Sequence, residues 1–224
     1  MELPEDARKM GASPSWIGYV GVDDVDAAAA RIERLGGVVH VPPTDVANIS
    51  RFAVFADPQT ARLALFKWLI PGQPAPEPGA PGRVGWHELL AADQNRALAF
   101  YGELFGWQEA DADIGETGTY QLFSAGEEPI GGMLTKPAAI PAPFWIYYFN
   151  VTDIDAAARR VKAGGGQIID GPVEVPGGSR IIRCRDPQGA IFALEGLRGR
   201  KAIGYFERDA SRNPSDARGR RWSW

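Results

Sequence analysis

Apolar and polar positions alternate along the chain in a pattern that occurs twice. Residues 16–66 align without a gap onto residues 145–195 at a constant offset of 129, and about 22 of the 51 aligned positions are identical. Such self-similarity indicates a repeated supersecondary unit. The two copies are therefore expected to have the same order of strands and helices.

Each copy begins with an apolar run rich in aromatic and β-branched residues, which predicts a strand. Asp24 or Asp153 follows and precedes an Ala-rich stretch with later basic residues, the pattern of an N-cap and a helix. Glycines predict the helix ends. Three more apolar stretches, the last after a DPQ turn, predict three strands. The expected unit is strand, helix and three strands, with strands at 16–22, 38–41 and 51–56 in one copy and at 145–151, 167–169 and 180–185 in the other.

A third unit of the same order precedes the second copy. It is expected to have a strand at 84–90, a helix at 93–105 and three short strands near 108, 120–124 and 131–134. The segment PGQPAPEPGAP cannot hold a helix or a central strand, so we expect a domain boundary there. The predicted organisation is a single module at 1–70, a linker at 71–82, a complete two-module domain at 83–197 and a basic extension at 198–224.

Composition narrows the function classes. The 24 Lys and Arg against 28 Asp and Glu give a net charge of −4, which argues against a nucleic-acid or anionic-membrane partner. The single Cys184 cannot form an internal disulfide, and the first residues lack the basic and then apolar pattern of a secretory signal. A cytoplasmic location is therefore expected.

Three segments carry a resemblance to a known family: VGWHELLAAD, AFYGELFGW and DPQGAIFAL. With the repeated modules, they resemble the vicinal oxygen chelate superfamily of glyoxalase, bleomycin-resistance and extradiol-dioxygenase proteins, and within it the tandem glyoxalase-like or hydroxylase-like proteins of bacteria. The resemblance covers residues 16–197. It implies an α+β fold of repeated βαβββ modules, paired into cupped mixed sheets with the helices outside.

The resemblance also implies a module count. Tandem members carry four modules, two per domain, whereas three are counted here, and the missing one corresponds to the first. A lone module exposes a sheet face that its partner would cover, and such a face is usually buried by association. We therefore expect a homodimer in which the unpaired N-terminal modules of two copies meet.

Metal-dependent relatives place ligands on the first and last strands of a module. The corresponding positions here are Ile17, Ala64, Trp86, Ile146 and Ala193, none of which can bind a metal. His87 misses this register by one residue, which turns it to the opposite face of a strand. Neither a metal nor a cofactor is therefore expected. The alternative needs a bulge that returns His87 to the site, with Glu88 and Glu195 as its companions.

Period-two alternation predicts which side chains share the cupped face. Glu88 and Glu195 are candidates for a general acid and base, although Glu88 also fits a structural hydrogen-bond acceptor and Glu195 a surface carboxylate. Alternation does not assign a cationic side chain to this face that could bind an anionic substrate group. Arg51 and Arg180, which are equivalent in the repeat, are the candidates, and a structural role fits them equally. The predicted substrate-binding residues are Trp86, Ile146, Tyr148, Asn150 and Ala193.

Three functions follow from this reading. The first is a metal-free protein that binds a small apolar or aromatic organic molecule in the cupped cleft and sequesters or transforms it. The second is a metal-dependent lyase or dioxygenase of the same superfamily. The third is a non-catalytic dimeric interaction module. The sequence leaves open whether the protein is an enzyme; if it is one, a lyase or oxidoreductase is expected.

Overall fold

A computed structural model describes residues 13–72, 79–115, 118–175 and 177–197. Its helices and strands form three successive βαβββ modules, so the predicted α+β class is confirmed. The first module holds a four-stranded sheet of order β1-β4-β3-β2. Its elements are β1 (Tyr19–Gly21), α2 (Val25–Arg34), β2 (Val38–Val46), β3 (Ser50–Ala56) and β4 (Arg62–Trp68).

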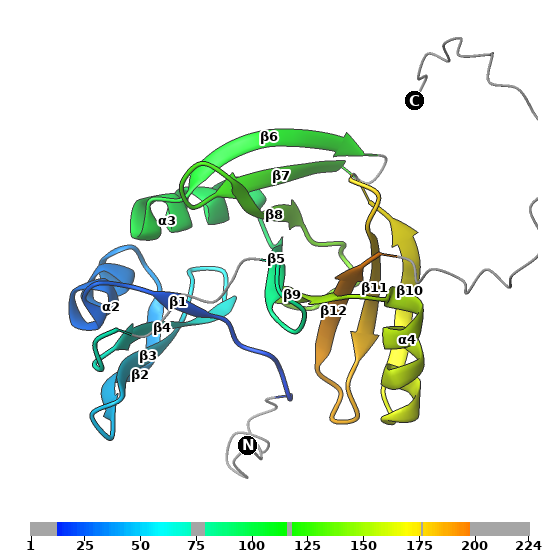
Figure 1. The fold of residues 1–224 in the computed structure, drawn as a ribbon. Coiled ribbons are helices and arrows are strands. Elements are labelled where there is room, and N and C mark those ends of the chain that lie inside the picture. Colours follow the sequence, from blue (N-terminus) through cyan, green and yellow to red (C-terminus); the bar gives the residue numbers. More distant parts are fainter. Residues whose placement is uncertain (1–12, 73–78, 116–117, 176, 198–224) are drawn as a thin grey trace, which may run out of the picture.

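The second and third modules share one eight-stranded sheet of order β10-β11-β12-β9-β5-β8-β7-β6, which curves strongly from one end to the other (Figure 1). The halves join where β5 pairs antiparallel with β9. Helices α3 and α4 lie outside the curve (Figure 1). The elements are β5 (Val84–Ala91), α3 (Gln94–Phe105), β6 (Gln108–Gly115), β7 (Gly118–Ser124), β8 (Pro129–Thr135), β9 (Phe144–Val151), α4 (Ile154–Ala163), β10 (Gln167–Glu174), β11 (Arg180–Arg185) and β12 (Ile191–Gly196).

The three helix starts have the same chemistry, as predicted. The side chains of Asp24, Asp93 and Asp153 each accept a hydrogen bond from a backbone N–H in the first turn of the helix that follows. An acceptor at this position satisfies a donor that the helix cannot pair internally. The local pattern therefore fixes where each helix begins.

The first module packs on the outer side of the eight-stranded sheet, where both contribute to one hydrophobic cluster. The hydroxyl of Tyr101 on α3 donates to Asp57, in the turn between β3 and β4, over 3.0 Å. The Gln59 side chain meets the backbone of Asp93 twice, at 2.6 and 2.9 Å. The buried Tyr101–Asp57 bond and the two exposed, reciprocal Gln59–Asp93 bonds fix the module against α3 and the residue that caps it.

The first strand is shorter than predicted. A strand was expected over 16–22, but β1 spans Tyr19–Gly21, whereas β9, its equivalent in the repeat, spans Phe144–Val151. The difference follows from pairing: β9 lies between β12 and β5, while among the described strands β1 pairs only with β4. A strand held on one edge has fewer ladder hydrogen bonds to extend it.

Two expectations lie partly or wholly outside the described residues. They are the linker, of which residues 73–78 are not described, and the basic extension at 198–224. Within the described part of the chain, no helix is long and apolar enough to cross a membrane. The expected homodimer stays a prediction.

Candidate functional site

The inner face of the eight-stranded sheet gathers most of the predicted site residues. Trp86 on β5 lies opposite Tyr148 on β9, which in turn lies beside Ala193 on β12. Glu88 lies opposite Ile146. Directly paired residues share a face, so the predicted alternation holds on all three strands. Ile146, Tyr148 and Ala193 are buried in one cluster, against which Trp86 packs.

Glu88 is the polar centre of this face. Its carboxylate is buried and accepts hydrogen bonds from the hydroxyl of Tyr148 at 3.0 Å and, more weakly, from that of Tyr120 at 3.4 Å. The Trp86 indole N–H donates to the Tyr120 hydroxyl over 2.9 Å. A buried carboxylate needs such donors to offset its lost hydration.

A cation completes the cluster. Nη2 of Arg183 lies 3.1 Å from Oε1 of Glu88, and Nε donates to the Tyr148 hydroxyl at 3.2 Å. Arg183 is on β11, and Ala193 on β12 is its direct neighbour. Because Ala193 is small, the guanidinium can extend across the sheet toward β5. A hydrogen-bonded pair of this kind neutralises a charge that burial alone would disfavour.

The two tyrosines are held as neutral donors. Burial and the nearby negative charge of Glu88 raise the pKa of Tyr148 well above its ordinary value. The same two causes raise the pKa of Tyr120. Both hydroxyls therefore keep their protons at neutral pH and can donate to an acceptor.

Two predicted residues lie one row away from this cluster. Glu195 is paired with Asn150 in the sheet register, and its carboxylate accepts from the Ser179 hydroxyl at 2.6 Å. The Asn150 side chain lies over Gly85, where an added Cβ would be 2.3 Å from its oxygen. Its Nδ2 is buried without a hydrogen-bond partner among the described residues. The carboxylates of Glu88 and Glu195 thus bond to different side chains, Tyr148 and Ser179 respectively. Their catalytic roles stay predictions.

His87 lies on the opposite face, as its position in the sequence predicts. Its Nδ1 is 2.8 Å from the Ile130 carbonyl oxygen, and its strand partner is Tyr147. The β5–β9 ladder does contain an irregularity, but it lies between Val84 and Trp86, so the register from Trp86 onward leaves His87 outside. Among the described residues, no three His, Cys, Asp or Glu side chains group as a metal site would need. The ligand positions of metal-dependent relatives converge here as Trp86, Ile146 and Ala193, which do not fit a metal.

Sequence reasoning missed two members of the cluster, Arg183 and Tyr120. It had considered Arg51 and Arg180 as cations for this face. Arg51 instead forms ion pairs with Asp26 and Asp45 in the first module. The Arg180 Nε is buried and without a partner in the described part of the chain. Strand alternation could have found Arg183. Ile181 pairs with Glu195 in the sheet, and Arg183, two residues further along β11, lies on the same face as Ile181.

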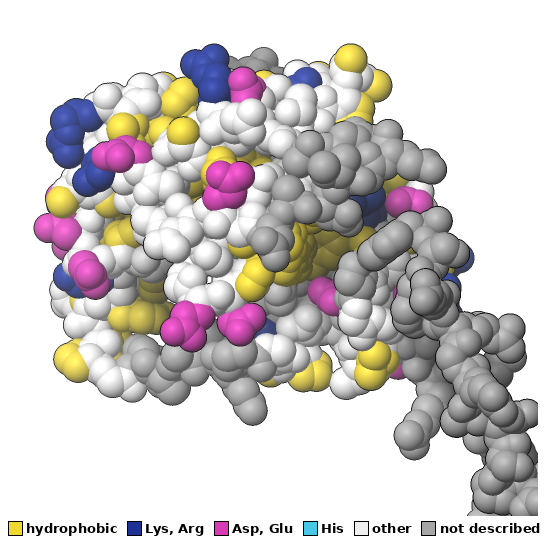
Figure 2. All heavy atoms as spheres, turned by 90° about the horizontal axis from the view of Figure 1, so that it is seen from above, with side chains coloured by type: hydrophobic (Ala, Val, Ile, Leu, Met, Phe, Trp, Pro, Cys, Tyr) yellow, Lys and Arg dark blue, Asp and Glu magenta, His cyan; other side chains and the backbone are white. Residues whose placement is uncertain are grey.

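Seen from above, the molecule has scattered acidic and basic side chains, and hydrophobic side chains show in a hollow near the middle of that face (Figure 2). Charge is thus spread over the surface there without a strongly basic patch.

Comparison with known proteins identifies the superfamily of this chain. The profile of the Glyoxalase/Bleomycin resistance protein/Dioxygenase superfamily matches residues 83–194. The chain belongs to this superfamily. A solved structure of similar fold, the Mn(II)-bound glyoxalase of Novosphingobium aromaticivorans, has a TM-score of 0.59 and 18% identity, and the match covers 80% of this chain and 61% of that one. The 2,3-dioxygenase LapB of Pseudomonas sp. KL28 follows with a TM-score of 0.54 and 13% identity, over 81% and 70% of the chains.

Other relatives have a higher sequence identity to this chain than these two solved structures do, and they are named for different roles. A protein of Mycobacterium tuberculosis named as a glyoxylase, CFP32, is 34% identical over 189 residues, which cover 82% of this chain and 70% of the relative. The anthracycline biosynthesis protein DauV of Streptomyces sp. strain C5 is 38% identical over 192 residues, covering 84% and 68%. The superfamily is therefore shown by sequence as well as by fold.

Proposed function

We propose that the inner face of the eight-stranded sheet binds a small apolar or aromatic organic molecule. The observation that carries the proposal is the buried Glu88 carboxylate, with Arg183 and the Tyr148 hydroxyl bound to it, set among apolar side chains. Apolar walls with a few fixed polar groups are the usual composition of a small-molecule site. The polar groups orient a ligand, and the aromatic rings supply contact area.

The names of the relatives support an aromatic ligand. DauV and its Streptomyces peucetius counterpart DnrV are named for anthracycline biosynthesis. The proposed role for this chain is ligand binding. The proposal does not include a reaction of the bound molecule. Glu88 already accepts from three side chains, which favours a positioning role for the carboxylate over proton transfer.

The test uses 1,4-dihydroxyanthraquinone as the probe, with the full chain in isothermal titration calorimetry. Tyr148→Phe removes one hydroxyl from the site, and Trp86→Leu removes its aromatic wall. We expect the first change to weaken binding about fivefold and the second more than tenfold, given the usual contributions of a hydrogen bond and an aromatic contact.

The control is Val38→Ala, because Val38 is exposed in the first module and lies away from the inner face. It should leave the affinity unchanged. Binding of the probe that is insensitive to both inner-face variants would contradict the proposal. A metal-dependent reaction is the alternative: about one Mn(II) or Zn(II) per chain by elemental analysis after incubation and desalting would favour it.

A further inference from the structure

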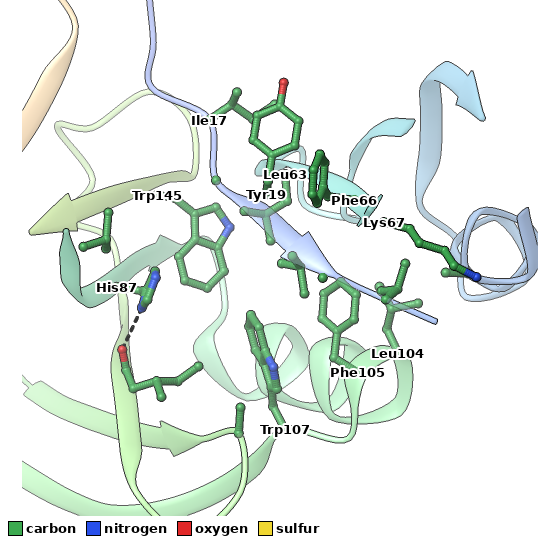
Figure 3. Close-up of a pocket in the computed structure, with 18 of the residues that line it drawn as sticks. Ile17, Tyr19, Leu63, Phe66, Lys67, His87, Leu104, Phe105, Trp107 and Trp145 are labelled. Carbon is green, nitrogen blue, oxygen red and sulfur yellow. Dashed lines mark hydrogen bonds between the residues drawn. The ribbon is translucent and has the colours of Figure 1, made fainter. Parts of the chain in front are cut away.

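A second space lies on the other side of the sheet, between the first module and the outer face of the eight-stranded sheet. The cavity has a volume of about 1180 Å³. Figure 3 shows β1 crossing it, with Tyr19 and Phe66 on one side and Phe105 and Trp107 on the other. The cavity exists only because the two parts of the chain pack together, and none of the inner-face residues lines it.

Aromatic rings dominate the walls. One wall comes from the first module and the other from the two-module sheet and the end of α3. Trp107 stacks on Phe123 at 4.8 Å and lies edge-on to Trp145 at 6.1 Å, so this wall is rigid and preformed. The aromatic lining residues include Tyr19, Phe66, Phe105, Trp107 and Trp145. Water against such a surface is unfavourable, and a flat apolar molecule would replace it.

His87 provides an acceptor in this wall. A carbonyl oxygen can only accept, so the contact with Ile130 places the ring proton on Nδ1 and leaves a lone pair on Nε2. Burial lowers the pKa of His87, which keeps the ring neutral. The second nitrogen points away from the Ile130 carbonyl, to the side where Trp145 lies (Figure 3). No hydrogen bond to Nε2 is found among the described residues, so a ligand there needs a donor.

The free edge of β1 adds backbone groups. Gly18 and Val22 bond to β4, so alternation turns the backbone N–H and C=O of Tyr19 and Gly21 to the opposite edge, where no described strand pairs with them. Both residues line the cavity. The Tyr147 hydroxyl, in contrast, is already used as an acceptor by the Gly18 N–H at 2.6 Å.

We propose that this cavity is a binding site for a planar aromatic molecule with a phenolic hydroxyl, which donates to Nε2 of His87 while the rings lie among the aromatic side chains. The volume is slightly above the range of about 300–1,000 Å³ typical of small-molecule sites, so a molecule of two to four fused rings fits. The site is independent of the inner face and does not rest on the function proposed for it.

The experiment compares 2-naphthol with 2-methoxynaphthalene, which has the same rings but no hydroxyl to donate, in calorimetric titrations of the full chain. His87→Phe should weaken 2-naphthol binding about five- to tenfold, the usual effect of losing one hydrogen bond, and leave 2-methoxynaphthalene unchanged. His40→Phe, at the other and exposed histidine, is the matched control and should change neither affinity.

A second variant keeps the proposal testable if His87→Phe fails to fold. Ala125 lines the cavity and is exposed in the turn between β7 and β8, so Ala125→Trp can be accommodated and brings an indole to the wall formed by the two-module sheet. It should abolish binding of both probes, whereas Tyr148→Phe on the inner face should affect neither.

Two results would overturn the proposal. One is binding of 2-naphthol that is lost in Tyr148→Phe but kept in Ala125→Trp, which would assign the aromatic ligand to the inner face alone. The other is an affinity for 2-naphthol that is the same in His87→Phe and in Ala125→Trp as in the unchanged chain, which would place the ligand outside this cavity.

Discussion

Arg183 reaches Glu88 across the sheet: Nη2 on β11 lies 3.1 Å from Oε1 on β5, although β12 and β9 lie between the two strands. The pair joins the two modules of the eight-stranded sheet through a buried charge. Tyr148, on one of the strands between them, bonds to both residues. The polar centre of the inner face is therefore also a link between modules.

Arg183→Gln should destabilise the protein. The Glu88 carboxylate would stay buried without its cation, and we expect the free energy of unfolding to fall by about 2 kcal/mol, less than for a fully buried pair because Arg183 is about one-third exposed. Urea denaturation measures the change. The double variant with Glu88→Gln should lose less than the sum of the single changes, and strict additivity would show that the two residues do not interact.

The Tyr101–Asp57 bond is expected to hold the first module in place. Tyr101 is fully buried, and its hydroxyl also accepts from the Trp145 indole N–H at 3.3 Å. Tyr101→Phe leaves both partners short of a bond, so we expect a loss of about 1–2 kcal/mol in the free energy of unfolding.

Thermal and urea unfolding of Tyr101→Phe test this expectation. Tyr19→Phe is a suitable control, since Tyr19 is 55% exposed and its hydroxyl bonds to no side chain or backbone group among the described residues. Equal stability of the two variants would mean that the hydroxyl of Tyr101 contributes nothing.

The sequence predicts features that depend on residues close together in the chain, and it misses features that depend on residues far apart in the chain. Helix starts at Asp24, Asp93 and Asp153 depend on a side chain and a backbone N–H only two or three residues apart, so the local pattern predicts them. The inner and outer faces of β5, β9 and β12 depend only on alternation along a strand. These features were therefore predictable without the fold.

The partners of Glu88 depend on strand order, which alternation does not encode. Arg183 is 95 residues away from it along the chain, and Tyr120 is 32 residues away. Both meet Glu88 only because β5 is central in the order β10-β11-β12-β9-β5-β8-β7-β6. The cavity beside His87 was not predictable either, because it depends on how the first module packs against the outer face.

Gly132 makes room for the Tyr120 ring. A Cβ there would lie 2.2 Å from Cζ of Tyr120, so Gly132→Ala must displace the ring and with it the bonds to Trp86 and Glu88. Overpacking of this kind typically costs about 1–3 kcal/mol. We expect a lower melting temperature and altered tryptophan fluorescence.

The control for this steric effect is Gly21→Ala, where an added Cβ meets nothing within 4 Å. Its stability should be unchanged or slightly higher, because the unfolded chain loses freedom. If Gly132→Ala melts like Gly21→Ala, the Tyr120 ring has another position available and the glycine is not needed for it.

Cys184 should be unreactive in the folded protein. Its side chain is fully buried on β11, and burial raises the pKa of the thiol to about 11. At about pH 8 such a thiol is only ~0.1% thiolate, the form that reacts. We expect no measurable reaction with a disulfide reagent in native buffer and one equivalent in concentrated urea. Val38→Cys, at a position 54% exposed, should react at once and serves as the positive control. Rapid reaction of the unchanged chain would mean that β11 opens readily, and the Arg183–Glu88 pair on the same strand could then not be a stable link between the modules.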